Sequence, residues 1–266
     1  MSAGGDDRFL QHDGARLRWR AQGLRNARGP VLVLIHGWAL SLEYWDCVLP
    51  GLEPTRAVLR YDRRGFGRTR GPYDPGKACG DLLALLDAAQ IDSAVLVGMS
   101  QGARVAIHAA IRAAHRVAAL VLDGAPWFED ESELPMARYR KLRDSDGIFA
   151  LRDVILEHPL MQPVHPDAAH RQLLATCVDF YKGDDLEGQW TPVPDPDLKS
   201  IRQPTLIING AQDSDARLAA GRKLGEAIAR ADRLELHGAG HLAALDNPDE
   251  WVHAVLGFTA AKQPWK

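Results

Sequence analysis

A serine between two glycines is the residue of this chain whose setting most favours covalent chemistry. Ser100 stands at the centre of the sequence GMSQG at 98–102. The apolar run at 93–97 predicts a strand, and the residues at 103–111, rich in helix formers, predict a helix directly after this motif. A serine at a sharp turn from strand to helix is held with its hydroxyl exposed, which is the arrangement of a nucleophile. We therefore expect Ser100 to act as a nucleophile.

The serine needs a base, because a hydroxyl group is a weak nucleophile at neutral pH. His241 is the histidine that best fits this role, since it follows a predicted strand at 233–236 and precedes the last predicted helix. The three small residues at 238–240 form a turn that can aim the imidazole towards Ser100. We expect His241 to be the general base.

A carboxylate must orient the base and stabilise its imidazolium form. Asp213 follows the predicted strand at 205–208, so it lies at the carboxyl edge of the sheet, where Ser100 also emerges. Asp215 lies two residues further on and could instead cap the helix that follows. Asp123 also ends a predicted strand. We take Asp213 as the acid, with Asp215 and Asp123 as alternatives.

The negative oxygen that forms when a serine attacks a carbonyl group needs hydrogen-bond donors. The backbone amide of Gln101, directly after Ser100, is one candidate. The second is the backbone amide of Trp38, in the loop after an apolar run at 31–35 that predicts a buried strand. We also expect four side chains to contact the substrate: Trp38, Gln101, Trp127 and Tyr139.

Short apolar runs alternate with helical segments along most of the chain, which is the pattern of a mostly parallel sheet with helices on both faces. Eight runs predict strands, at 9–11, 15–22, 31–35, 57–61, 93–97, 117–122, 205–208 and 233–236. The first two are joined by Asp13-Gly14, a typical hairpin turn. Besides the helix after Ser100, helices are predicted at 80–90, 215–230 and 248–261. The chain is therefore predicted to adopt an α/β fold.

The alternation is interrupted once, at residues 127–202, where the composition is helical and no strand is evident. Loops of this length are uncommon in a compact domain. We therefore predict a helical cap subdomain at 127–202, inserted into a core formed by 1–126 and 203–266. The proline-rich segment at 191–196 is typical of a stiff connector back to the core.

The composition is that of an ordinary globular protein, with 266 residues of which 46% are hydrophobic and 25% charged. A net charge of -3 offers no basic surface for nucleic acid or for a membrane. The start of the chain lacks a secretory signal and the three cysteines lack metal-like spacing, so we expect a cytoplasmic protein without a metal. The glycines at 65, 67 and 71 are wrongly spaced for a dinucleotide loop, so we expect no cofactor. The expected partner is a small molecule, and the expected state is a monomer or homodimer.

Taken together, these motifs resemble those of the α/β-hydrolase superfamily, in the same order along the chain. The matching pieces are the segments at 36–38, 61–67, 98–102, 210–213 and 238–241, with the pair at 247–248. Within the superfamily, the chain is most similar to small serine esterases and to 3-oxoadipate enol-lactonases. The resemblance implies an eight-stranded sheet with a helical cap after the sixth strand. It also implies a triad of Ser100, Asp213 and His241, with an oxyanion hole formed by the amides of Trp38 and Gln101.

The resemblance further implies a serine hydrolase that cleaves a carboxylic ester or lactone through an acyl-enzyme intermediate. Two alternatives stay open on the same fold. One is cofactor-free oxygenase or perhydrolase chemistry on the same triad, and the other is ligand binding by a receptor-like protein with little turnover. Gln101 departs from the family, which often has methionine after the nucleophile. Its polar side chain could contact the substrate or the cap.

Overall fold

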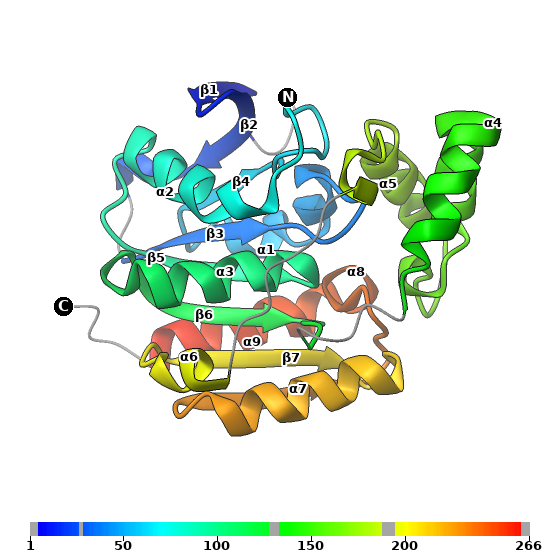
Figure 1. Cartoon of the computed structure of the whole chain (residues 1–266). Helices are drawn as coiled ribbons and strands as arrows, with labels where there is room; N and C mark the ends of the chain where they lie inside the picture. Colours follow the sequence, from blue (N-terminus) through cyan, green and yellow to red (C-terminus); the bar gives the residue numbers. More distant parts are fainter. Residues whose placement is uncertain (1–4, 27–28, 128–132, 188–194, 262–266) are drawn as a thin grey trace.

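The centre of the molecule is an eight-stranded sheet with the strand order β1-β2-β4-β3-β5-β6-β7-β8 (Figure 1). The computed structural model describes residues 5–26, 29–127, 133–187 and 195–261. The strands are β1 (Arg8–His12), β2 (Ala15–Gln22), β3 (Val31–Ile35), β4 (Val58–Tyr61), β5 (Ala94–Met99), β6 (Val117–Asp123), β7 (Thr205–Gly210) and β8 (Ala231–Leu236). β2 is antiparallel to β1 and β4, and all other neighbouring strands are parallel. The predicted mostly parallel, eight-stranded sheet is therefore confirmed.

Helices cover both faces of the sheet because its central strands are apolar on both sides. All five residues of β3 are buried, with Leu32 and Leu34 in the core of one face and Val33 and Ile35 in the core of the other. The first face packs against α1 (Leu49–Leu52), α8 (Ala243–Asp246) and α9 (Pro248–Ala261). The second face packs against α2 (Ala78–Ala88), α3 (Gln101–Arg112), α6 (Asp195–Ser200) and α7 (Asp215–Ala227).

The predicted helices agree with the structure to within a few residues. α9 has the predicted bounds, whereas α7 ends three residues before the predicted end at 230. It ends there because Ile228 is buried in an extended conformation (φ −95°, ψ 112°), which turns the chain towards β8. α1 and α8 were not predicted, since a helix of four residues is too short to carry a periodic pattern. No helix in the described ranges has both the length and the apolar character needed to cross a lipid bilayer.

Between β6 and β7 the chain forms a group of helices beyond the carboxyl ends of the strands (Figure 1). This group, which we call the cap, comprises α4 (Met136–Leu156), η5 (Pro159–Met161), α5 (Ala168–Val178) and η6 (Asp184–Glu187). α6 lies inside the range predicted for the cap but packs on α3 and α7 of the core. Residues 128–132 and 188–194 lie outside the described part, so most of the predicted connector is not described. The division into core and cap subdomains stays a prediction.

A buried ion-pair cluster holds the start of η2 (Leu42–Cys47), the short helix that comes after the loop following β3. Arg18 of β2 is fully buried, and its Nη2 lies 2.5 Å from Oε1 of Glu43 while its Nη1 lies 3.1 Å from Oδ2 of Asp62. Asp62 also accepts a hydrogen bond of 2.8 Å from the backbone amide of Leu42. Leu42 and Glu43 begin η2, so the cluster holds η2 against β2 and the end of β4.

We expect Arg18→Met to lower the free energy of unfolding by about 3–5 kcal/mol, because it leaves the buried carboxylate of Asp62 without a cation and Glu43 with only Arg20 at 3.6 Å. Chemical denaturation monitored by circular dichroism measures this loss. The matched control is Arg20→Met in the same strand, whose side chain is 17% exposed, pairs with Asp7 at 2.6 Å and reaches Glu43 at 3.6 Å. That substitution should cost about 1 kcal/mol or less. Equal losses in the two variants would contradict the special role of the buried cluster.

Candidate active site

Ser100 occupies the turn between β5 and α3 with a strained backbone. Its φ of 51° and ψ of −118° are rare for any residue other than glycine. The glycines on either side allow the turn, since a Cβ on Gly98 would lie 2.6 Å from Cα of Ala103 and one on Gly102 only 2.1 Å from the carbonyl oxygen of Ile35. The sharp strand-turn-helix geometry predicted around Ser100 is therefore present in the structure.

His241 lies against Asp213. The Nδ1 atom of His241 is 3.1 Å from Oδ2 and 3.2 Å from Oδ1 of Asp213, whose side chain is fully buried. Asp213 is itself held by the backbone amide of Ser214, which donates to Oδ1 at 2.8 Å. Gly124 leaves room for the pair, since a Cβ there would lie 3.0 Å from Cε1 of His241. With Nδ1 directed at the carboxylate, Nε2 is the imidazole atom left for a reaction partner.

The two other candidate acids do not reach the imidazole. Asp215 is exposed in the first turn of α7. Asp123 ends β6 and accepts a hydrogen bond of 3.0 Å from Nε1 of Trp251 in α9. Burial raises the pKa of Asp123 to about 8, and the nearby carboxylates of Asp213 and Asp246 add to this shift. Of the three candidates, Asp213 is the one that the structure brings to His241.

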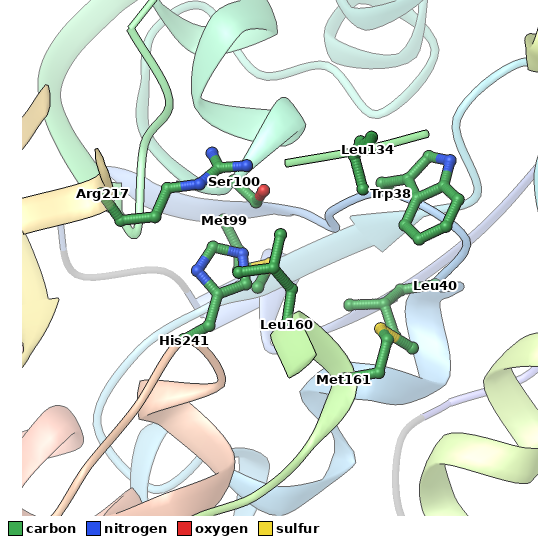
Figure 2. Close-up of a pocket in the computed structure, with 9 residues that line it drawn as sticks. All are labelled: Trp38, Leu40, Met99, Ser100, Leu134, Leu160, Met161, Arg217 and His241. Atoms are coloured by element: carbon green, nitrogen blue, oxygen red, sulfur yellow. The ribbon is translucent and has the colours of Figure 1, made fainter. Parts of the chain in front are cut away.

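Ser100 and His241 line one cavity between the sheet and the cap (Figure 2). Its nine lining residues are Trp38, Leu40, Met99, Ser100, Leu134, Leu160, Met161, Arg217 and His241. The cavity has a volume of about 260 Å³, which includes the space at its opening to solvent. The wall is mainly apolar, and the side chains that can take part in proton or charge interactions are few, as is common for sites that bind small organic molecules.

The loop after β3 brings the backbone of Trp38 close to Ser100. A Cβ on Gly37 would lie 2.4 Å from Sδ of Met99 and 3.3 Å from Cβ of Ser100, so the loop passes directly over the turn that carries the serine. Gln101 is the first residue of α3, and the amide of a first helical residue has no acceptor within its own helix. Both predicted oxyanion donors therefore belong to segments that meet at Ser100.

The four predicted substrate contacts lie in different places. The indole of Trp38 lines the cavity, and the ring of Tyr139 stacks on it at 5.6 Å without being among the lining residues. The side chain of Gln101 is not among the lining residues, and its Oε1 accepts a hydrogen bond from Nη2 of Arg63 at 3.3 Å. Trp127 also lies outside the cavity lining, with Nζ of Lys223 over its ring at 5.2 Å.

Arg217 lines the cavity and was not singled out from the sequence. It stands in the first turn of α7, with Nε 2.6 Å from Oε2 of Glu133 and Nη1 3.4 Å from the carbonyl oxygen of Gly124. Arg217 follows Asp213 by four residues, in a helix that begins at the carboxyl edge of the sheet. This position is the feature of the sequence that could have identified Arg217 as a residue near the site. Within the described ranges, no group of three or more histidine, cysteine, aspartate or glutamate side chains is arranged to hold a metal ion.

Comparison with known proteins agrees with this architecture. The model of the alpha/beta hydrolase fold family matches residues 30–162, which is half of the chain. A 2-hydroxy-6-oxo-2,4-heptadienoate hydrolase of Pseudomonas putida is 28% identical over 88% of this chain and 90% of that protein. The 3-oxoadipate enol-lactonase 2 of Acinetobacter baylyi is 26% identical over 85% and 87% of the two chains.

Among solved structures, the enol-lactonase from Burkholderia xenovorans LB400 has a TM-score of 0.78 and 26% identity, over 95% of this chain and 100% of that chain. The matching family model, these relatives and the sheet topology lead to one conclusion: the chain belongs to the alpha/beta hydrolase fold family.

Proposed function

We propose that this protein hydrolyses a carboxylic ester or a lactone through an acyl-enzyme, with Ser100, His241 and Asp213 as its catalytic triad. The observation that carries the proposal is the convergence of a strained serine and a carboxylate-bound histidine on one apolar cavity. The names of the two enol-lactonases that resemble the chain support the substrate class.

In the first step, Oγ of Ser100 attacks the carbonyl carbon of the substrate while Nε2 of His241 takes the hydroxyl proton. The electron pair of the carbonyl bond moves to oxygen, where the amides of Trp38 and Gln101 donate hydrogen bonds. Asp213 stabilises the imidazolium that results, because its carboxylate lies 3.1 Å from Nδ1.

The tetrahedral intermediate then collapses and breaks the bond to the leaving oxygen, which takes the proton back from His241. In an ester this oxygen departs as an alcohol, and in a lactone it stays attached to the acyl chain. A water molecule repeats the two steps on the acyl-enzyme, with His241 again as base and then as acid, and releases the carboxylic acid and free Ser100.

The first experiment measures hydrolysis of short and long p-nitrophenyl esters, of several lactones and of 2-hydroxy-6-oxo-2,4-heptadienoate, with wild type beside Ser100→Ala. We expect wild type to prefer short acyl groups, because the cavity is small. The alanine variant should lose about 10⁴–10⁶-fold in kcat, because the nucleophile is gone. Turnover in the variant within tenfold of wild type would contradict the proposal, and a folded wild type without turnover would favour the receptor-like alternative.

The choice of acid is tested by changing each candidate carboxylate to its amide. Asp213→Asn should lower kcat by about 10⁴-fold, because the asparagine stabilises the wrong tautomer of the imidazole. Asp123→Asn should leave kcat within about threefold at neutral pH, because the carboxyl group of Asp123 already carries a proton there. Asp215→Asn is the exposed control. A larger loss in Asp123→Asn than in Asp213→Asn would overturn the assignment.

The raised pKa of Asp123 also predicts how the stability of the fold depends on pH. The folded protein keeps a proton on this carboxyl up to about pH 8, whereas the unfolded chain loses it near the ordinary value of 3.8. Folding therefore binds a proton between these values, and stability falls by up to about 1.4 kcal/mol per pH unit as the pH rises. Asp123→Asn removes this contribution.

Thermal unfolding between about pH 5 and 8 measures the effect, and one kcal/mol corresponds to about 2–4 °C in Tm for a chain of this size. The Tm of Asp123→Asn relative to wild type should rise steadily over this interval. A difference that is independent of pH would contradict the protonated state of Asp123.

A further inference from the structure

Arg63 contacts Gln101 and the peptide group that joins Gly37 to Trp38, so it touches both segments that carry the proposed oxyanion amides. Its Nη2 donates to the carbonyl oxygen of Gly37 at 2.9 Å and to Oε1 of Gln101 at 3.3 Å. The side chain comes from the loop after β4, is 3% exposed and does not line the cavity. Resting on the proposed function, we propose that Arg63 is a positioning residue that holds the oxyanion hole in its active geometry.

The contact with Gly37 fixes the amide of the next residue. Gly37 supplies the carbonyl group of the peptide whose N–H belongs to Trp38. In a planar trans peptide, the C=O and N–H bonds point in opposite directions. Because Arg63 holds the carbonyl oxygen of Gly37, the N–H of Trp38 must point to the opposite side of this peptide, and we infer that this side faces the substrate carbonyl at Ser100.

The backbone of Arg63 supports the same carbonyl group through His36. The amide of Arg63 donates to Nε2 of His36 at 3.0 Å, so this nitrogen carries no proton. The proton of the neutral imidazole is then on Nδ1, which lies 2.9 Å from the carbonyl oxygen of Gly37 and donates to it. Burial, with the nearby charge of Arg63, holds the pKa of His36 well below its usual value and keeps the ring neutral. Gly37 thus accepts two hydrogen bonds, both of which depend on Arg63.

The contact with Gln101 fixes the second donor. Gln101 is the first residue of α3, so a hydrogen bond to its side chain restrains the position of the first turn of that helix. Because the same nitrogen of Arg63 also binds Gly37, one guanidinium group connects the two segments that carry the oxyanion donors. The ring of Phe66 lies 4.4 Å from Cζ of Arg63 and restricts the plane of that group.

The guanidinium group of Arg63 has no close ion-pair partner among the described residues, although the more distant charge of Asp185 acts on it. In the part of the chain that the structure describes, no carboxylate oxygen lies within 4.0 Å of its guanidinium nitrogens. An arginine stays protonated even when buried. Its positive charge therefore lies next to the peptide group between Gly37 and Trp38 and next to the side chain of Gln101, and it stabilises the developing oxyanion more than the uncharged substrate.

The test compares Arg63→Met, Arg63→Lys and Gln101→Met with wild type on the best p-nitrophenyl ester. We expect Arg63→Met to lower kcat by about 10–100-fold with KM within about threefold, somewhat less than the loss of a complete oxyanion donor. Arg63→Lys should fall in between, since one ammonium cannot reproduce the planar fork of the guanidinium. Gln101→Met should cost about 3–10-fold, and adding it to Arg63→Met should have little further effect, because both remove one network.

A trifluoromethyl ketone with the same acyl chain provides the second measurement, because its adduct with the serine places an oxyanion in the hole. Its inhibition constant should rise by the same factor as kcat/KM falls. The matched control is Arg64→Lys, a neighbouring buried arginine whose Nη2 pairs with Asp81 at 2.6 Å, away from the cavity. This variant should keep wild-type kcat and ketone affinity.

Arg63→Met should fold, because it breaks no close ion pair, and Asp185, the buried carboxylate whose pKa burial raises and the charge of Arg63 lowers in part, keeps its hydrogen bond from Trp38. A variant with lower Tm but unchanged kcat and ketone affinity would give Arg63 a structural role only and overturn the inference. A rise in KM alone would do the same. If Ser100→Ala retains turnover, the proposed function fails. If Ser100→Ala is inactive and Arg63→Met is fully active, only this inference fails.

Discussion

Ser100 keeps its strained backbone because three segments of main chain meet around it at distances that leave no room for a side chain. A Cβ on Gly102 would lie 2.1 Å from the carbonyl oxygen of Ile35, and one on Gly37 would lie 2.4 Å from Sδ of Met99. Strained residues cost about 1–3 kcal/mol each and persist only where their surroundings fix them. Here β5 and α3 are buried on both sides of Ser100, and its amide donates to the carbonyl oxygen of Asp123 at 2.7 Å. The packing of the core therefore offsets the strain.

The segment after β4 supplies hydrogen bonds to the loop that follows β3. Because this loop packs closely against the turn at Ser100, some of its backbone groups are buried, and buried backbone groups must be hydrogen-bonded. Arg63 holds the loop near its start, at Gly37, and Asp62 holds the amide of Leu42 at its end. Two consecutive residues thus anchor both ends of the loop that carries Trp38. Arg18 in turn neutralises Asp62, so the cation in β2 also supports the loop indirectly.

Much of the fold and part of the site could be predicted because they depend on consecutive residues. The strand, turn and helix around Ser100 are encoded in one stretch, and parallel strands bring their carboxyl ends, with Asp213, to one edge. Arg217 reaches the cavity through the placement of α7, and Leu134 through the segment before α4, and no local pattern encodes either placement. The partner of Gln101 lies 38 residues away along the chain, so its hydrogen bond was equally invisible in the sequence.

Trp38 connects the chemistry of the site to the cap. Nε1 of its indole donates to Oδ2 of Asp185 in η6 at 2.9 Å, and Tyr139 of α4 stacks on the ring. Asp185 is 2% exposed, so little water is available to replace this hydrogen bond if it breaks. A displacement of η6 away from the core must therefore break the bond or move Trp38 with it. Because the backbone of Trp38 also carries a proposed oxyanion donor, this hydrogen bond links the position of η6 to the proposed chemistry at Ser100.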